Sequence, residues 1–149
     1  MSNLDNVKFD SKPTLKKPII VCGLHGSFNN GNASIGVVDY LIDQYDAEKF
    51  AELPAARYHI YQMPGGENLR PTFRMENGLI KEAHFPRNEF FYATVPGSDH
   101  DLLLLQGIEP NMNWEEYADA VVSVAREFGA ARLYSFAVSW KGRLIPANR

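Results

Sequence analysis

The chain of 149 residues is poor in the features that mark several large protein classes. Its single cysteine, Cys22, excludes an intramolecular disulfide. A formal net charge of −3 gives none of the basic character of nucleic-acid-binding proteins. The longest apolar runs, such as 102–105, are too short to span a membrane, and residues 1–13 contain no apolar signal core. These absences predict a cytoplasmic protein that binds neither nucleic acid nor a membrane.

The composition that is present is typical of a soluble globular domain. Hydrophobic residues make up 45% of the chain and charged residues 22%. The length is enough for one domain. The sequence therefore predicts an N-terminal arm over residues 1–17, a single α/β domain over 18–138 and an irregular tail over 139–149.

Hydrophobic spacing predicts two helices and about seven strands. Apolar residues recur at helical spacing over 33–45 and 114–128, with Asn32 and Asn113 as expected N-caps. The continuous apolar run at 19–23 is typical of an interior strand. Asn77-Gly78 predicts a hairpin turn. The remaining expected elements are a short helical turn at 47–53 and strands at 57–62, 72–75, 79–84, 88–95, 101–105 and 132–138.

The segment from Cys22 to Asn32 is rich in glycine and asparagine and lies between the first strand and the first helix. Glycines let a backbone approach a ligand closely, and a helix N-terminus offers unpaired N–H groups to an anion. The segment lacks the lysine of a phosphate-binding P-loop, and its glycines miss the dinucleotide-binding spacing. The candidate ligand-binding residues are Gly23, His25, Gly26, Asn29, Asn30, Gly31 and Glu109.

Glu109 is included because it follows a buried strand, where open α/β sheets place their ligands. The alternative interpretation, which we favour, is structural. The glycine-rich segment is then a tight strand-to-helix turn, and Glu109-Pro110 is a corner that holds the next turn.

Other chemistry has little support in the sequence. Ser27 is not part of a nucleophile elbow, so a catalytic triad is not expected. Cys22 ends a buried strand, where a thiol behaves as a small hydrophobe. Residues 99–101 alternate Asp, His and Asp, but neighbours on an extended segment point in opposite directions, which favours a polar strand entry over a metal site. We therefore expect no catalytic residue, no metal and no cofactor.

Aromatic residues carry a modest argument for association. Trp114, Tyr117 and Phe128 are expected in the core on one helix stripe. The consecutive aromatics at 90–92 must face both sides of their strand, so some of them meet either a second layer or a partner.

Three segments together resemble the proteasome assembly chaperone two family. They are the glycine-rich turn with the following residues 37–53, the strand-rich region containing residues 85–93, and residues 100–136. The most specific piece runs from the strand ending at 107–110, through the Trp-led helix, to Phe128-Gly129-Ala130. The resemblance covers about residues 9–136.

The resemblance implies a three-layer α/β/α fold with a mixed sheet, shaped like the core of purine nucleoside phosphorylases, with an antiparallel hairpin insertion. It also implies a non-catalytic role in protein assembly. The expected partners are further copies of the chain, a related subunit or proteasome α subunits. The alternative is a protein that binds a nucleotide or nucleoside-like small ligand at the glycine-rich turn, or an enzyme with phosphorylase or hydrolase chemistry there, assisted by Glu109.

The C-terminus departs from the family pattern. It ends Ala147-Asn148-Arg149 and lacks the hydrophobic-Tyr-any residue tail of proteasome-binding relatives. Relatives also continue into more sheet after the strand at 133–136. We expect the chain to be a truncated or frame-shifted member whose last dozen residues are not family sequence.

Overall fold

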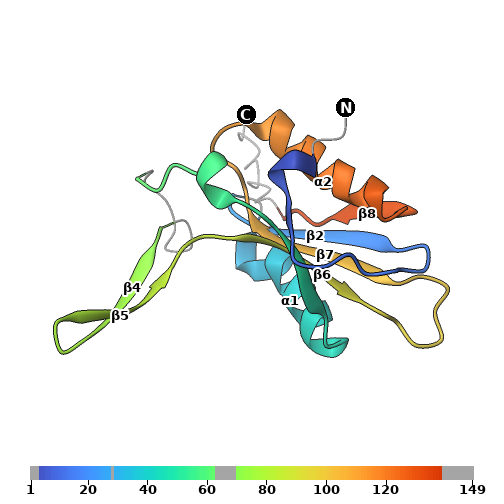
Figure 1. Ribbon diagram of the computed structural model, residues 1–149, viewed down its shortest axis with the longest axis horizontal. Helices are drawn as coiled ribbons and strands as arrows, with labels where there is room; N and C mark the ends of the chain where they lie inside the picture. The colour runs from blue at the N-terminus through green and yellow to red at the C-terminus, as the bar shows by residue number, and fades with distance from the viewer. Residues whose placement is uncertain (1–3, 28, 63–69, 139–149) are drawn as a thin grey trace, which may run out of the picture.

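The computed structural model describes residues 4–27, 29–62 and 70–138, and these form a mixed α/β fold with a projecting hairpin (Figure 1). The elements in chain order are η1 (Leu4–Asn6), β1 (Lys8–Phe9), β2 (Ile19–His25), η2 (Asn30–Asn32), α1 (Ala33–Gln44), β3 (Glu48–Leu53), η3 (Ala55–Arg57), β4 (Thr72–Glu76), β5 (Leu79–His84), β6 (Asn88–Ala93), β7 (Leu102–Ile108), α2 (Trp114–Glu127) and β8 (Arg132–Ser135). The predicted tail at 139–149 lies outside the described residues.

Six strands form one mixed sheet in the order β1-β3-β6-β7-β2-β8. β2 runs parallel to both of its neighbours, β7 and β8, whereas the other pairings are antiparallel. This confirms the prediction that the first apolar run is an interior strand. The N-terminal segment joins the sheet, since Lys8 and Phe9 pair with β3.

Each face of the sheet carries one helix, and the apolar side chains divide between the two layers accordingly. α2 covers the larger cluster with Tyr117, Val121 and Val124, against strand residues that include Phe50 and Phe90. α1 covers the opposite face, where a smaller cluster consists of Val21, Val38 and Leu104, with partly buried neighbours that include Phe91. The expectation that the consecutive strand aromatics face both layers is confirmed.

Two predicted elements are wrong. Residues 47–53 were expected to be helical but form β3, because this segment pairs with β6. A register shift between Lys49 and Ala51 buries Phe50 and Ala51 together, which breaks strand alternation in the sequence. Residues 57–62 were expected to be a strand, but Arg57 ends the short helix η3 and residues 58–62 form no strand. There, Tyr58 packs edge-on against Tyr117 at 5.2 Å between ring centroids.

Both helices begin where the sequence predicts, but the expected capping bonds are absent. Asn32 and Asn113 occupy the N-cap positions in left-handed conformation, and neither side chain caps its helix. The amide of Asn113 instead donates to the carbonyl of Arg57 at 2.9 Å. Trp114 is half exposed, so its expected core position is also wrong, whereas Tyr117 is buried as predicted.

The predicted hairpin is confirmed, with Asn77 and Gly78 at positive φ in its turn. β4 and β5 pair only with each other among the described strands, and the hairpin projects from the sheet (Figure 1). Within the described residues, no helix has both the length and the apolar character needed to cross a membrane.

Candidate functional site

The sheet has a topological switch point between β2 and β7. These parallel neighbours both end at the same edge, where His25 lies beside Ile108. The chain leaves β2 into α1 on one face of the sheet, and leaves β7 into α2 on the other face (Figure 1). Connections that diverge to opposite faces open a crevice at the carboxyl ends of the strands, which is where open α/β sheets bind ligands.

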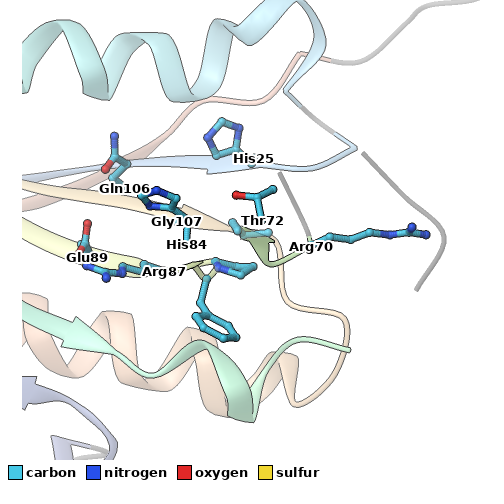
Figure 2. A pocket seen from close by; sticks show the side chains of 11 residues that line it. His25, Arg70, Thr72, His84, Arg87, Glu89, Gln106 and Gly107 are labelled. Carbon is cyan, nitrogen blue, oxygen red and sulfur yellow. Dashed lines mark hydrogen bonds and ion pairs between the residues drawn. The ribbon is translucent and has the colours of Figure 1, made fainter. Parts of the chain in front are cut away.

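A pocket of about 630 Å³ lies at this edge, between the strand ends and the base of the hairpin (Figure 2). The lining residues are His25, Arg70, Thr72, His84, Phe85, Pro86, Arg87, Glu89, Gln106, Gly107 and Ile108. Thr72 and His84 are paired across the hairpin, so β4 and β5 supply one wall of the pocket. Glu89 in β6 and Arg87 just before it also line the pocket, because β6 starts at the edge where β7 ends.

The charges in the pocket are partly compensated. The carboxylate of Glu89 accepts a hydrogen bond from Lys49 Nζ at 2.9 Å and lies 3.4 Å from Arg87 Nη1. Gln106 Nε2 donates to Asp39 Oδ1 at 2.6 Å, which ties β7 to α1. Burial lowers the pKa of His25, and the charge of Asp39 offsets this only in part.

Asn88 holds the strand ends in place from beneath the pocket. Its side chain is fully buried, and its Oδ1 accepts from the backbone N–H of Ile108 at 2.9 Å and from the hydroxyl of Tyr117 at 3.4 Å. Its Nδ2 donates to the carbonyl of Leu53 at 3.4 Å. One side chain therefore joins β3, β6, β7 and α2.

The glycine-rich turn is occupied by an anionic group of the chain itself. Glu109 Oε2 accepts from the backbone N–H of Ser27 at 2.9 Å and from its hydroxyl at 2.7 Å. Gly26 lies against this carboxylate at φ +146, and a Cβ there would collide with the Glu109 side chain. The absence of a side chain at Gly26 thus lets Glu109 reach across the turn.

The other candidate residues in the turn also contact the chain. Asn29 Oδ1 accepts from the backbone N–H of Ile35 at 3.0 Å, in the first turn of α1. Asn30 Nδ2 donates to the carbonyl of Val138 at 3.2 Å. A Cβ on Gly23 would meet α1 at 2.6 Å, so this glycine permits the close packing of helix on strand. Gly31 has a positive φ of 65°.

Of the seven predicted ligand-binding residues, His25 lines the pocket, whereas the lining does not include the other six. The hairpin base, Arg87 and Glu89 were not among the residues predicted to bind a ligand. A signal was present in residues 85–89, where basic and acidic side chains flank the start of an aromatic strand. Assigning them to the site requires knowing that β6 runs antiparallel to β7.

The other groups considered for chemistry have structural surroundings. Burial raises the pKa of the Cys22 thiol to about 12. The carboxylate of Asp101 accepts from the backbone N–H of Lys16 at 2.6 Å. Across the described ranges, no group of three or more His, Cys, Asp or Glu side chains is placed to hold a metal ion.

The hairpin has one apolar face and one charged face. Cross-strand pairing places Phe73 with Ala83 and Met75 with Ile80 on the same face, and Phe85 extends it through an edge-on contact with Phe73. Phe73, Met75, Ile80 and Phe85 are all at least half exposed. We call these four residues and Ala83 the apolar hairpin face.

The opposite face of the hairpin carries charge. Arg74 lies 2.6 Å from Glu76 and 3.8 Å from Glu82, and these pairs share their face with Leu79. The two faces of one hairpin therefore differ sharply in polarity.

These features define an open α/β sheet protein with a switch-point crevice and a projecting hairpin. The family model described as the PAC2 family matches residues 24–138, and this chain belongs to that family. None of the proteins with curated functions matches the chain.

Solved structures support the assignment. The chain is similar to a PAC2 family protein from Streptomyces avermitilis, with 28% identity, a TM-score of 0.67, and coverage of 78% of this chain and 47% of that one. It is also similar to a proteasome-assembly chaperone homologue from Mycobacterium tuberculosis, with 27% identity, a TM-score of 0.70, and coverage of 77% and 47%.

A M. tuberculosis protein of unknown function shares the fold, with 21% identity, a TM-score of 0.72, and coverage of 85% of this chain and 44% of that one. This chain therefore spans about half the length of each of these relatives.

Proposed function

We propose that this chain is a non-catalytic assembly factor that works through protein–protein contacts, with the apolar hairpin face as its docking surface. The observation that carries the proposal is the exposure of four large apolar side chains on one face of a projecting two-stranded hairpin. A two-stranded hairpin alone is marginally stable in water, so a covering layer would stabilise it. Exposed apolar patches of this kind are often interaction sites.

The occupant that fits this face best is a second copy of the chain. The five residues of the face are uncharged, whereas Arg74 pairs with Glu76 and Glu82 on the opposite face. Two identical uncharged faces related by a two-fold axis complement each other, and sheets stack face to face at about 10 Å. The five residues of the face contribute nothing to the net charge of −3 on each copy, so they add no charge repulsion to such a contact.

The family supports an assembly role, because one similar structure is a proteasome-assembly chaperone homologue. We propose the cytoplasm as the location, on the ordinary soluble-domain composition of the sequence. In this role the chain performs no chemical step. Specificity comes from the shape of the hairpin and its aromatic and aliphatic anchors.

Sedimentation velocity tests this proposal over about 1 to 100 µM chain, a range suited to micromolar self-association. We expect a concentration-dependent shift from the 16.8-kDa monomer to a dimer. A monomer at every concentration would exclude the second copy. That monomer is then titrated with purified proteasome α subunits. Co-sedimentation would show that the apolar hairpin face binds this partner and not a second copy. No co-sedimentation would overturn the assembly role.

A further inference from the structure

We propose that the pocket between the strand ends and the hairpin base binds a small organic anion that bears a phosphate or carboxylate group. The site differs from the glycine-rich turn that the sequence singles out, although the two share His25. It shares Phe85 with the apolar hairpin face, whose other four residues do not line the pocket.

The charge balance of the lining favours an anion. Arg70, His84 and Arg87 supply basic groups, and Glu89 is the one carboxylate among the lining residues. Lys49 binds Glu89 at 2.9 Å from outside the pocket, but it also binds Glu52 at 3.2 Å, so its charge is shared between two carboxylates. With Arg70 and Arg87 against Glu89, the lining residues include one more guanidinium than carboxylate. A guanidinium group is suited to paired hydrogen bonds with a phosphate or carboxylate.

The position and size of the pocket fit a small ligand. It lies at the switch point between β2 and β7, where ligands bind in open α/β sheets. Its volume of about 630 Å³ falls within the range of small-molecule sites. Figure 2 shows His25 on one side of the space and Thr72 and His84 across from it, with Arg87 beside Glu89 and Arg70 extending away from the others. The hydroxyl of Thr72 adds a neutral donor.

The glycine-rich turn is less suitable for the same ligand. Glu109 Oε2 already accepts from both the N–H and the hydroxyl of Ser27. A second anion at the turn would meet this carboxylate at close range, and like charges repel. The binding roles first predicted for Gly26, Asn29 and the other turn residues remain predictions.

The pocket and the docking surface can be used independently. Thr72 and His84 pair on the hairpin face opposite the one that carries Phe73 and Ala83. A ligand in the pocket therefore leaves most of the apolar hairpin face accessible. Failure of self-association would say nothing about ligand binding, and the reverse also holds.

Isothermal titration calorimetry with three probes tests the inference. The probes are inorganic phosphate, succinate and the uncharged succinamide. We expect saturable binding of phosphate, succinate or both, and none of succinamide. The first two arms distinguish a phosphate ligand from a carboxylate ligand. No saturation with either anion up to about 10 mM, well beyond ordinary ligand affinities, or equal binding of succinamide, would overturn the proposal.

Two variants with the same change in charge localise the site. Arg87→Gln removes a guanidinium that lines the pocket, whereas Arg74→Gln removes one of similar exposure on the hairpin outside it. We expect Arg87→Gln to weaken anion binding about tenfold or more, as loss of a hydrogen bond to a charged group does. Arg74→Gln should leave the affinity unchanged. Equal losses in the two variants would show nonspecific charge attraction and contradict the site.

His84→Asn provides a second variant in case Arg87→Gln does not fold. It removes a basic group from the pocket wall at an exposed position on β5. We expect weaker anion binding with an unchanged circular dichroism spectrum. If Arg87→Gln does not fold, unchanged affinity in a folded His84→Asn protein would overturn the proposal.

Discussion

The substitution Ile80→Ser tests whether the apolar hairpin face mediates self-association. Ile80 is 61% exposed, so most of its side chain remains available for burial by a partner. Full burial of an isoleucine is worth about 1.5–3 kcal/mol, which leaves about 1–2 kcal/mol per copy. A two-fold contact contains the residue twice, so the loss is about 2–4 kcal/mol and the dimer Kd should rise roughly 30-fold or more.

Leu79→Ser is the matched control for this experiment. Leu79 is 63% exposed and adjacent in sequence, but it pairs with Glu76 on the charged face of the hairpin. Both substitutions remove an apolar side chain near the same turn, so their effects on hairpin stability should be similar. Sedimentation velocity should show weaker association only for Ile80→Ser. Equal effects of the two substitutions, or none from Ile80→Ser, would refute the assignment of the face.

Three further predictions concern the parts of the fold that hold the site. Gly26→Ala should destabilise the protein by about 1–3 kcal/mol in urea unfolding, because alanine is strained at the positive φ of this position and its methyl group would collide with the Glu109 side chain; an unchanged midpoint would exclude that clash. Asn88→Val should lower the free energy of unfolding by about 2–4 kcal/mol, because the buried N–H of Ile108 and the carbonyl of Leu53 lose their hydrogen-bond partner. A decrease of less than 1 kcal/mol would contradict this role of Asn88. Burial lowers the pKa of His59 and of His25, so stability should fall as the pH drops below about 6.5, where the unfolded state binds more protons. His59→Gln should reduce the difference between urea midpoints at pH 7.5 and 5.5, and an unchanged difference would exclude His59 as a source.

The physical reason for the His59 effect is visible in its contacts. Its ring is buried, with Asn88 Nδ2 at 3.4 Å from Nε2, and Nδ1 has no hydrogen-bond partner in the described part of the chain. Protonation would place a charge in this site and set an N–H against the Asn88 donor. The folded state therefore favours the neutral imidazole.

The elements with strong local signals could be predicted from the sequence. The apolar stripe of α2, the interior strand β2 and the Asn-Gly hairpin all follow from periodicity or turn chemistry, and the structure confirms them. Gly129 also lies just after α2 with the positive φ expected of a helix-ending glycine.

The failures come from tertiary pairing. β3 contains good helix formers, but its pairing with β6 and a register shift at Lys49 override their local preference. Tyr58 reaches the core from a turn rather than a strand. Its backbone carbonyl accepts from the backbone N–H of Asn111 at 2.8 Å, in the loop before α2, and not from a neighbouring strand. Neither contact leaves a periodic signal in the sequence.

The candidate site, like the fold, could be predicted only in part. His25 could be placed at the end of β2 from the sequence alone. Arg87 and the hairpin residues could not, because their position depends on the direction of β6 and on how the hairpin folds back. The shape likeness to purine nucleoside phosphorylases, the domain boundaries and the expected C-terminal truncation stay predictions.

The most direct test of the central claim is a distance measurement between hairpins of two copies. A spin label at Glu76→Cys lies on the charged face near the turn, outside the proposed contact. Cys22 should stay unlabelled, because it is buried and its thiol pKa is raised to about 12. A second label at Asp99→Cys, in an exposed loop between β6 and β7, is the control.

Double electron–electron resonance should give a defined distance for Glu76→Cys below about 50 Å, since a six-residue strand is only about 20 Å long and the sheets stack about 10 Å apart. The Asp99→Cys pair should be farther apart, because its loop lies at the end of the molecule away from the hairpin (Figure 1). That pattern would support association through the apolar hairpin face. No dipolar coupling at Glu76→Cys, or a shorter distance at Asp99→Cys, would contradict it.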